Sequence, residues 1–453
     1  MFKLIPFLLL ALFLSISCKN DDLVNLSNPS ENTTVVNENV TVYNEEQITP
    51  GFTLISPTTS TNAYLINMEG FVVNKWESTR TSVANYLTEN GDLIRTYIVD
   101  NDTFSFGGRT GGIEMYNYNG EIIWDWTYSS SSYTLHHDIA LLPNGNILAS
   151  VWDLKTAQEA IEAGRDPNLL ADNVVWIERI IEIQPLGLND AQIIWEWSMW
   201  DHLVQDIDTT KNNFGIVSEN PSRVDINKTI GDANFTHVNS LFYIEEFDQI
   251  LISSRRLGEL FIIDHSTSIT EASSISGGNY NKGGDFLYRW GNPLNYNSGT
   301  EDNKKLFAQH DIRWINNLPK NGDGNILVFN NARNPNNQDG STIDEIKLPV
   351  LQDGSYNLEP STNNLPEDYS WSYINEEIYA PRVSGSQRLI NGNTLITEGT
   401  EGTLWEINNN GEVIWQYVIP LEVNNIFRAS RYQSDFPGFQ DKDLSIKDHI
   451  IID

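Results

Sequence analysis

GTLWEINNNGEVIWQY, residues 402–417, decides the fold, because similar stretches recur along the whole chain. Each copy has a branched or aromatic run, a turn at Gly or Asn, and then a branched pair ahead of Trp or Tyr. Recurring self-similarity of this kind predicts a repeat architecture. The other copies are TNAYLINMEGFVVNKW (61–76), GGIEMYNYNGEIIWDW (111–126), IIEIQPLGLNDAQIIWEW (180–197), GELFIIDHSTSIT with GGDFLYRWG (258–270 and 283–291), and STIDEIKLPV with EDYSWSY (341–350 and 367–373).

A second phrase, centred on a tight turn, follows four of the six copies. It reads LTENGDLIRTY (87–97), LLPNGNILAS (141–150), LPKNGDGNILVFNN (318–331) and RLINGNTLITEG (388–399). Its Asn-Gly and Asp-Gly pairs supply the positive φ that tight hairpins require, and the branched and aromatic runs favour strands. Each unit therefore holds about four short strands. Four-stranded units arranged radially predict an all-β, six-bladed β-propeller.

The spacing of the terminal aromatic residues predicts where loops are inserted. Trp76 and Trp126 are 50 residues apart and Tyr373 and Tyr417 are 44 apart, which fits bare blades. The gaps between these two pairs are longer and require insertions. One insertion contains LKTAQEAIEAGRDPNLLADN (154–173), the only clear helical stretch. Insertions on a propeller commonly decorate its binding face.

The first residues, MFKLIPFLLLALFLSISC (1–18), predict an export signal, because one Lys precedes an apolar run and small residues. The run is short for a membrane-spanning helix. SISC (15–18) resembles a bacterial lipoprotein cleavage box, although Leu is commoner at its first position, and Cys18 would be the lipidated residue. Cys18 is the only cysteine. We therefore expect an exported lipoprotein on the periplasmic or cell-surface side of the outer membrane, with a plain cleaved signal as the alternative.

The chain divides into three expected parts: the signal peptide 1–18, a polar tether 19–45 rich in Asn, Ser and Thr, and a propeller 46–453. The net charge, 28 − 61 = −33, excludes nucleic acid as a partner, because a phosphate backbone requires a basic face. The same charge opposes anionic substrates at long range. A site for anions would therefore need its own concentrated cations.

Histidine is scarce, with seven in 453 residues, and four of the seven fall at repeated positions. His136 and His137 in LHHDI, His237 in FTHVNS and His310 in AQHDI follow Trp-bearing strands and begin or precede the next hairpin. Six-fold repetition places them at equivalent points, where strands enter the central channel. Arg255 follows His237 by 18 residues, about one strand–turn–strand, and so returns to the same mouth.

The residues alone leave three interpretations of this cluster open. His beside Asp could ligate a metal, but strand neighbours face opposite sides and Arg255 would repel a cation. The cluster could instead be structural, with polar side chains that satisfy one another. The third interpretation is anion chemistry, with imidazole as nucleophile or acid and Arg as a clamp on oxyanions. His202, His265 and His449 lack the repeated context and are interpreted as surface or structural residues.

At these residues the chain resembles the bacterial aryl-sulfate sulfotransferases. The resemblance rests on HHDI with LPNGN, on H-x-N-S with the later S-x-R, on QHD with GNIL-x-F-x-N, and on the closing segment IFRASRYQSDFPGF (426–439). It covers about residues 64–438. Members of this family are six-bladed propellers of the periplasm or cell surface. They move a sulfuryl group from a phenolic sulfate ester to a phenol without the nucleotide sulfate donor PAPS.

The resemblance implies a role for each matching residue. His310 would be the histidine that becomes transiently sulfated, and His237 and Arg255 would hold the sulfuryl oxygens. His137 would act on the phenolic oxygen, with His136 as the alternative because the histidine is doubled. These roles imply ping-pong kinetics through a sulfohistidine, with a phenolic sulfate donor and a phenol acceptor as partners and neither a metal nor an organic cofactor.

Two further residues take less specific roles from the resemblance. Asn239 would be a polar contact to the substrate, and Arg428 would line the channel or brace the last blade. Better-known members carry an N-terminal β domain and a disulfide, which we expect to be missing here, so the oligomeric state stays open. An aryl-sulfate hydrolase and a non-catalytic surface propeller that binds glycans or a protein are the alternatives.

Overall fold

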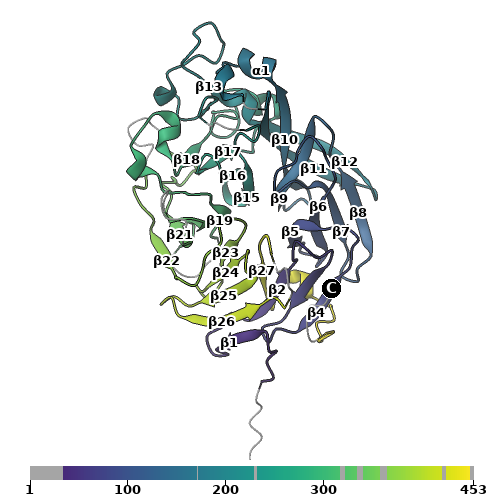
Figure 1. Ribbon diagram of the computed structural model, residues 1–453. Coiled ribbons are helices and arrows are strands. Elements are labelled where there is room, and N and C mark those ends of the chain that lie inside the picture. The colour runs from purple at the N-terminus through teal and green to yellow at the C-terminus, as the bar shows by residue number, and fades with distance from the viewer. Residues whose placement is uncertain are drawn as a thin grey trace, which may run out of the picture. The chain divides into compact units, whose positions relative to one another are not determined.

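Six antiparallel sheets are arranged around a ring in the computed structural model (Figure 1), which confirms the predicted six-bladed β-propeller. The predicted signal peptide with Cys18, the tether as far as residue 33, and His449 lie outside the described residues. The structure describes residues 34–170, 172–228, 232–316, 322–333, 340–357, 365–420 and 425–448.

The first three blades each contain four strands that follow one another outward from the ring centre. The second sequence phrase supplies the inner two strands of a blade, and the Trp-bearing phrase supplies the outer two. In blade order the strands are β27 (Ser430–Gln433), β2 (Gly51–Ile55), β3 (Ala63–Ile66) and β4 (Val72–Trp76); then β5 (Ser82–Leu87), β6 (Leu93–Ile98), β7 (Gly111–Tyr116) and β8 (Ile122–Thr127); then β9 (Tyr133–Leu141), β10 (Ile147–Thr156), β11 (Val174–Leu186) and β12 (Asp190–Ser198).

The remaining three blades have the same order of strands from the centre outward. They contain β15 (Val238–Ile244), β16 (Gln249–Ser254), β17 (Glu259–Asp264) and β18 (Tyr288–Trp290); then β19 (His310–Trp314), β20 (Ile326–Asn330), β21 (Thr342–Ile346) and β22 (Trp371–Ile374); then β23 (Gly385–Arg388), β24 (Thr394–Glu398), β25 (Thr403–Ile407) and β26 (Val413–Val418).

Two strand exchanges between the ends of the chain close the ring. β27, near the C-terminus, pairs antiparallel with β2 in blade 1, and β1 (Val40–Tyr43) pairs with β26 in blade 6. Because β1 lies inside the predicted tether, the expected boundary at residue 45 was wrong, and the propeller begins several residues earlier. This strand was missed because its four residues stand among Asn-rich turns. Its stability comes from Val40 and Tyr43, which pack on the core between blades.

The hydrophobic core lies between neighbouring blades, and the repeated Trp positions hold the blades together. The indole N–H of Trp76 donates to the Asn117 carbonyl in blade 2 at 2.9 Å. Trp197 in blade 3 and Trp415 in blade 6 donate in the same way to the following blades, each at 2.8 Å. All three side chains are fully buried. These tryptophans are therefore wedges between neighbouring blades.

The insertions contain only short helical elements. Residues 154–156 of the predicted helix 154–173 extend β10, because they pair with β11, and only α1 (Ala157–Glu162) and one 3₁₀ turn follow. No helix in the described part of the chain is long and apolar enough to span a membrane. The other minor elements are α2 (Ile269–Ala272), β13 (Leu203–Val204), β14 (Val224–Asp225), and the 3₁₀ turns Pro167–Leu169, Met199–His202, Val217–Glu219, Glu245–Phe247, Pro293–Tyr296, Glu301–Asn303 and Pro437–Phe439.

Candidate functional site

The innermost strands of the blades face the ring centre (Figure 1), and the predicted histidines lie in or next to three of them. His136 and His137 lie in β9, His237 immediately precedes β15, and His310 is the first residue of β19. The pairing of each strand with its neighbour is interrupted here by a bulge. The sequence repeat therefore brings three strands that carry or adjoin these histidines to the ring centre.

The bulges hold three non-glycine residues in a left-handed backbone conformation. His137 has φ 47°, His237 has φ 51° and Asp311 has φ 51°. Such a residue costs about 1–2 kcal/mol, and strained backbone of this kind clusters at functional sites. Bulges also re-aim side chains relative to a regular strand.

The imidazole of His310 is held in one tautomer by Asn331. The Asn331 amide nitrogen donates to the carbonyls of Ala380 (2.7 Å) and Val383 (3.0 Å), so its oxygen faces His310. That oxygen lies 2.7 Å from His310 Nδ1, which must carry the proton and donate it. The lone pair of His310 is therefore on Nε2, the atom that a nucleophilic imidazole would use.

His237 has the opposite tautomer in this hydrogen-bond network. The Asn234 amide nitrogen lies 2.7 Å from His237 Nδ1 and donates to it, so the ring proton sits on Nε2. The Asn234 oxygen is buried and has no hydrogen-bond partner in the described part of the chain. His237 is thus arranged as a hydrogen-bond donor, whereas His310 presents a lone pair.

Arg255 lies beside these histidines and carries no countercharge. Its backbone N–H donates to the His237 carbonyl at 3.1 Å, which fixes the two residues side by side. Its guanidinium makes no hydrogen bond or ion pair with any residue that the structure describes, whereas the adjacent Arg256 pairs with Asp232 at 2.5 Å. In a chain with 61 acidic and 28 basic side chains, an unpaired and largely buried guanidinium is available to an anionic ligand.

His137 is the inner member of the histidine pair, and His136 lies behind it. The rings of His137 and His237 are 4.7 Å apart. The Nδ1 atoms of His136 and His137 are 3.0 Å apart, and His136 stacks on Trp152 at 4.3 Å. On its far side, His136 Nε2 lies 2.8 Å from Glu178 Oε2, an ion-pair contact that is not aligned as a hydrogen bond. The doubled histidine therefore forms a chain from a buried carboxylate to the ring next to His237.

A glycine leaves room for the His137 ring. Gly108 has φ 86°, and its carbonyl accepts a 2.6 Å hydrogen bond from the His137 backbone. A Cβ at this position would lie 1.9 Å from His137 Nε2. Only glycine therefore fits between the loop and the imidazole.

His137, His237 and His310 are neutral near neutral pH. Burial is the largest cause that lowers the pKa of His137, of His237 and of His310. The charge of Arg255 lowers the pKa of His237 and of His310 further. For His310 the resulting pKa is about 3. A neutral imidazole retains the lone pair that nucleophilic attack or base catalysis requires.

Arg428 also reaches the ring centre, but its charge is neutralised. Its Nη1 lies 3.0 Å from Asp138 and 3.0 Å from Asp311, and it donates to the Tyr86 hydroxyl at 2.8 Å. The same carboxylates accept backbone N–H groups from the following blades, Asp138 from Leu241 and Asp311 from Ser386 at 2.9 Å. The Asp of each His-Asp pair thus ties blades together and does not bind its neighbouring histidine. Although burial opposes the charge, these two carboxylates raise the pKa of Arg428.

Asn239 is fully buried beside the same strands. Its amide nitrogen donates to the Gln309 carbonyl at 2.7 Å, next to His310 in the chain. Its side-chain oxygen has no hydrogen-bond partner among the residues described. The Asn239 oxygen is therefore an acceptor close to the candidate nucleophile.

An aromatic cluster from the β6–β7 loop and from strands β10 and β11 packs against the histidines. Phe104 lies 5.0 Å from Trp176, and Phe106 lies 5.5 Å from the same indole. Trp152 joins them to the site, because its ring contacts both His136 and, at 6.1 Å, His237. The β6–β7 loop of blade 2 and the β10–β11 end of blade 3 therefore lie on the face that carries the histidines.

Sequence reasoning missed several residues of this site. Asn331 stands in the quoted phrase LPKNGDGNILVFNN, but nothing in the phrase distinguishes it from Asn330. Glu178 is far from the histidines in sequence, and Asn234, three residues before His237, belongs to no repeated phrase. Among the described residues no group of three or more His, Cys, Asp or Glu side chains is placed to hold a metal ion. The predicted site residue Cys18 lies outside the described residues.

A six-bladed propeller with neutral imidazoles and a free guanidinium at its axis is the class of protein that the fold and the site define. The sequence pattern of the arylsulfotransferase (ASST) family matches residues 37–425, and the chain belongs to this family. Membership supports an arylsulfotransferase-type function with phenolic substrates. No curated protein sequence matches the chain.

Solved structures resemble this protein only distantly. A protein of unknown function from Bacteroides caccae is 12% identical with a TM-score of 0.45, covering 85% of this chain and 100% of its own. AztD from Citrobacter koseri is 9% identical (TM-score 0.40; 85% and 99% covered). Virginiamycin B lyase from Staphylococcus aureus is 10% identical (TM-score 0.36; 84% and 87% covered). Similarity at this level carries no information about activity.

Proposed function

We propose that the protein is an aryl-sulfate sulfotransferase that moves a sulfuryl group from a phenolic sulfate ester to a phenol through a sulfated His310. The observation that carries the proposal is the combination of a neutral imidazole with a free Nε2 and an unpaired guanidinium beside it. The first supplies a nucleophile and the second a clamp for the sulfuryl oxygens. A purely structural cluster would pair its buried cation with a carboxylate, as Arg428 does.

In the first half-reaction, His310 Nε2 attacks the sulfur atom. The N–S bond forms, the bond between sulfur and the phenolic oxygen breaks, and the phenolate leaves with that electron pair. Arg255 and the Nε2–H of His237 donate to the sulfuryl oxygens, whose charge the transition state concentrates. The Asn331 oxygen accepts from Nδ1–H and stabilises the positive charge that develops on the sulfated ring.

In the second half-reaction, a phenol replaces the departed product and attacks the same sulfur atom. His137 accepts the phenolic proton, the new S–O bond forms, and the N–S bond electrons return to His310 Nε2. Binding of the anionic ester raises the pKa of the nearby imidazoles, because a negative charge favours their protonated form. His137 can thereby donate a proton to the first leaving group and accept one from the second.

Asn239, His136 and Arg428, which the resemblance places near the substrate, have different roles in this proposal. Asn239 offers its unpartnered oxygen to the phenolic hydroxyl, and His136 acts through His137. Arg428 braces the inner strands, since Asp138 and Asp311 already neutralise it.

We also propose, from the residues 1–18 alone, export as a lipoprotein anchored through Cys18 to the outer membrane. Retention of Cys18→Ala in the membrane fraction of expressing cells would contradict that anchoring.

The test is release of the phenol from a chromogenic aryl sulfate, measured with and without a second phenol as acceptor. We expect release that rises with acceptor concentration and is lost in His310→Ala. His265→Gln is a matched control, because His265 lies away from the channel and pairs with Asp248 and Glu182. Mass spectrometry of donor-treated protein should find one SO₃ group on the peptide that contains His310.

Each other outcome selects a different function. Release that is indifferent to acceptor identifies an aryl-sulfate hydrolase. Release that survives in His310→Ala contradicts His310 as the nucleophile. No release from a panel of aryl sulfates, with the wild-type protein folded, would leave a propeller that only binds its ligand.

A further inference from the structure

The blades use one position of the outermost strand to bind the following blade, and blade 5 departs from this rule. This position is the first of the two aromatic residues that end the Trp-bearing phrase, or the residue at the same place in the strand where that aromatic is absent. In blade 5 the position is Trp371, whose indole N–H has no hydrogen-bond partner among the described residues. Five of the six blades donate a hydrogen bond from it to the next blade: Asn74 to Tyr118, Trp124 to Asp190, Trp195 to Thr267, Tyr288 to Leu365 and Trp415 to Met68.

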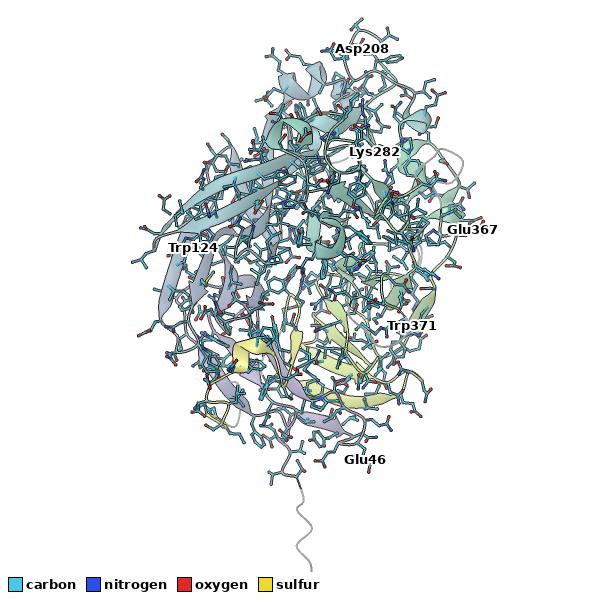
Figure 2. All side chains as sticks on the ribbon, turned by 180° about the vertical axis from the view of Figure 1, so that it is seen from behind. Glu46, Trp124, Asp208, Lys282, Glu367 and Trp371 are labelled. Carbon is cyan, nitrogen blue, oxygen red and sulfur yellow. The ribbon has the colours of Figure 1, made fainter. Side chains whose placement is uncertain are left out.

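At Trp371 the boundary between blades opens into a groove of about 940 Å³. The groove lies at the end of blade 5 where β19 finishes, so it is at the opposite end of that strand from His310. Trp371 stands at the rim of the ring, on the other side from Trp124 (Figure 2). The residues that carry the argument are Asn325, Glu345, Lys347, Ser370, Trp371 and Arg388.

The side chains around Trp371 repeat an arrangement that is sealed between blades 6 and 1. There, Arg431 lies 4.9 Å over the Trp415 ring and pairs with Glu406 at 3.0 Å, and Asn393 donates to Glu406 at 2.8 Å. Trp415 and Glu406 are 0% exposed and Arg431 is 3% exposed. In this interface the paired side chains are buried between one blade and the next.

Around Trp371 the same chemistry faces the groove. Arg388 lies 4.6 Å over the indole and pairs with Glu345 at 2.7 Å, and Asn325 donates to Glu345 at 2.5 Å. Trp371 is half-buried, and Lys347 is exposed without an ion-pair partner in the described part of the chain. The donors and acceptors are therefore fixed in place by one another, while the indole N–H is left unused.

The charges and surfaces of the groove select a class of ligand. Glu345 and Arg388 neutralise each other, and the chain's net charge of −33 disfavours an anion. An aromatic surface with fixed amide, carboxylate and hydroxyl groups suits a molecule that has apolar C–H faces and hydroxyls at its edges. We propose that this groove binds a neutral saccharide, with Trp371 packing against a sugar ring and its N–H donating to a hydroxyl. The proposal is independent of sulfuryl transfer.

The test is calorimetric titration of the purified protein with cellohexaose, xylohexaose, mannohexaose and maltohexaose, with dextran sulfate as an anionic comparison. We expect at least one neutral probe to bind with Kd below about 1 mM. Trp371→Ala should weaken that binding at least about tenfold, since stacking and one hydrogen bond are lost. Trp126→Ala is the matched control, because this outer-strand Trp of blade 2 lies outside the groove and should bind like the wild type.

A second variant keeps the test decisive if Trp371→Ala fails to fold. Asn409→Trp adds bulk at an exposed turn on the groove wall and should block the probe while leaving thermal unfolding unchanged. Both variants should retain sulfuryl transfer. The proposal is overturned if no neutral probe binds, if only dextran sulfate binds, or if binding is unchanged in both Trp371→Ala and Asn409→Trp.

Discussion

Two cationic regions meet at the centre of the ring, and they differ in what balances their charge. The sulfuryl cluster, which comprises His237, Arg255 and His310, has a guanidinium with no carboxylate partner in the described residues. The arginine bridge, in which Arg428 joins Asp138 and Asp311, has two carboxylates at 3.0 Å from one nitrogen. Most of their residues lie on or next to the innermost strands, whereas Arg255 follows β16, the second strand of blade 4.

The difference separates a binding function from a structural one. The charge of a buried guanidinium that pairs with carboxylates is balanced within the fold. Its removal leaves those carboxylates charged and unpaired in a low-dielectric interior. A guanidinium without a partner adds little to stability and gains most from an anion that arrives from outside. The His-Asp pairs in β9 and β19 contribute to both the site and the bridge. His137 and His310 belong to the candidate site, whereas Asp138 and Asp311 belong to the arginine bridge.

The largest expected effect on stability comes from the arginine bridge. Arg428→Met would leave the buried Asp138 without its cation and Asp311 with Arg313 alone, and we expect the free energy of unfolding to fall by about 3–5 kcal/mol. Urea denaturation measures this change. Arg255→Met is the matched comparison and should alter the unfolding midpoint little. Equal destabilisation by the two variants would remove the distinction between bridge and cluster.

The largest expected effect on activity comes from the other arginine. Arg255→Met should lower kcat/KM for aryl-sulfate-dependent transfer by about 10²–10³-fold, because one preorganised donor to the sulfuryl oxygens is lost. Steady-state kinetics at several donor concentrations measures it. Arg256→Met is the control, since Arg256 is already paired with Asp232 and should change the rate only a few-fold. A neutral result for Arg255→Met would return this cluster to the structural interpretation.

Sequence repetition predicted the blades and the placement of the histidines, because both follow from a pattern that recurs. The Trp phrase and the turn phrase define strands by composition, and equivalent positions in a ring must meet at its axis. His237 and Arg255 could be brought together by counting residues across one hairpin. The positions of His136 and His137 could not be ordered, because the bulge that re-aims them appears only in the pairing of β9 with β10.

The remainder depended on contacts between residues of different blades. Asn331 acts on His310 only because the carbonyls of Ala380 and Val383 orient its amide, and neither carbonyl is marked in the sequence. Arg428 was open between lining and bracing until its contacts with Asp138 and Asp311 were seen. The strand β1 was likewise invisible, since it forms only against β26.

Asn331 gives a smaller effect that sharpens the account of the sulfuryl cluster. Asn331→Leu removes the acceptor that fixes the His310 tautomer, and we expect kcat/KM to fall by about 10–100-fold. Asn331→Asp keeps an acceptor but adds a negative charge, which raises the pKa of His310. The acid limb of its pH–rate profile should therefore lie at higher pH than in the wild type. An unmoved acid limb together with full activity in Asn331→Leu would contradict the positioning role.

The smallest effects concern stability against pH, where the cluster and a distant histidine should behave in opposite ways. Burial and Arg255 lower the pKa of His310 to about 3 in the folded protein, whereas a histidine in the unfolded chain has a pKa of about 6.5. As the pH falls, the unfolded chain therefore takes up this proton before the folded protein does. Stability should therefore fall as the pH drops below that value. The pKa of His265 is shifted in the opposite direction. Although burial opposes its charge, hydrogen bonds to Asp248 and Glu182 raise its pKa to about 9. Its contribution is complete below about pH 6.5 and is lost as the pH rises through 9.

Two variants separate these contributions in urea denaturation carried out from about pH 5 to about pH 9. His310→Asn should flatten the acid side of the profile, because one of the three neutral buried histidines no longer takes up a proton on unfolding. His265→Gln should flatten the alkaline side and leave the acid side unchanged. If His310→Asn altered the alkaline side instead, His310 would be charged in the folded protein. It would then have no free lone pair to attack sulfur. The contrast between a cluster of neutral imidazoles and a charge-paired arginine bridge would then not hold for His310.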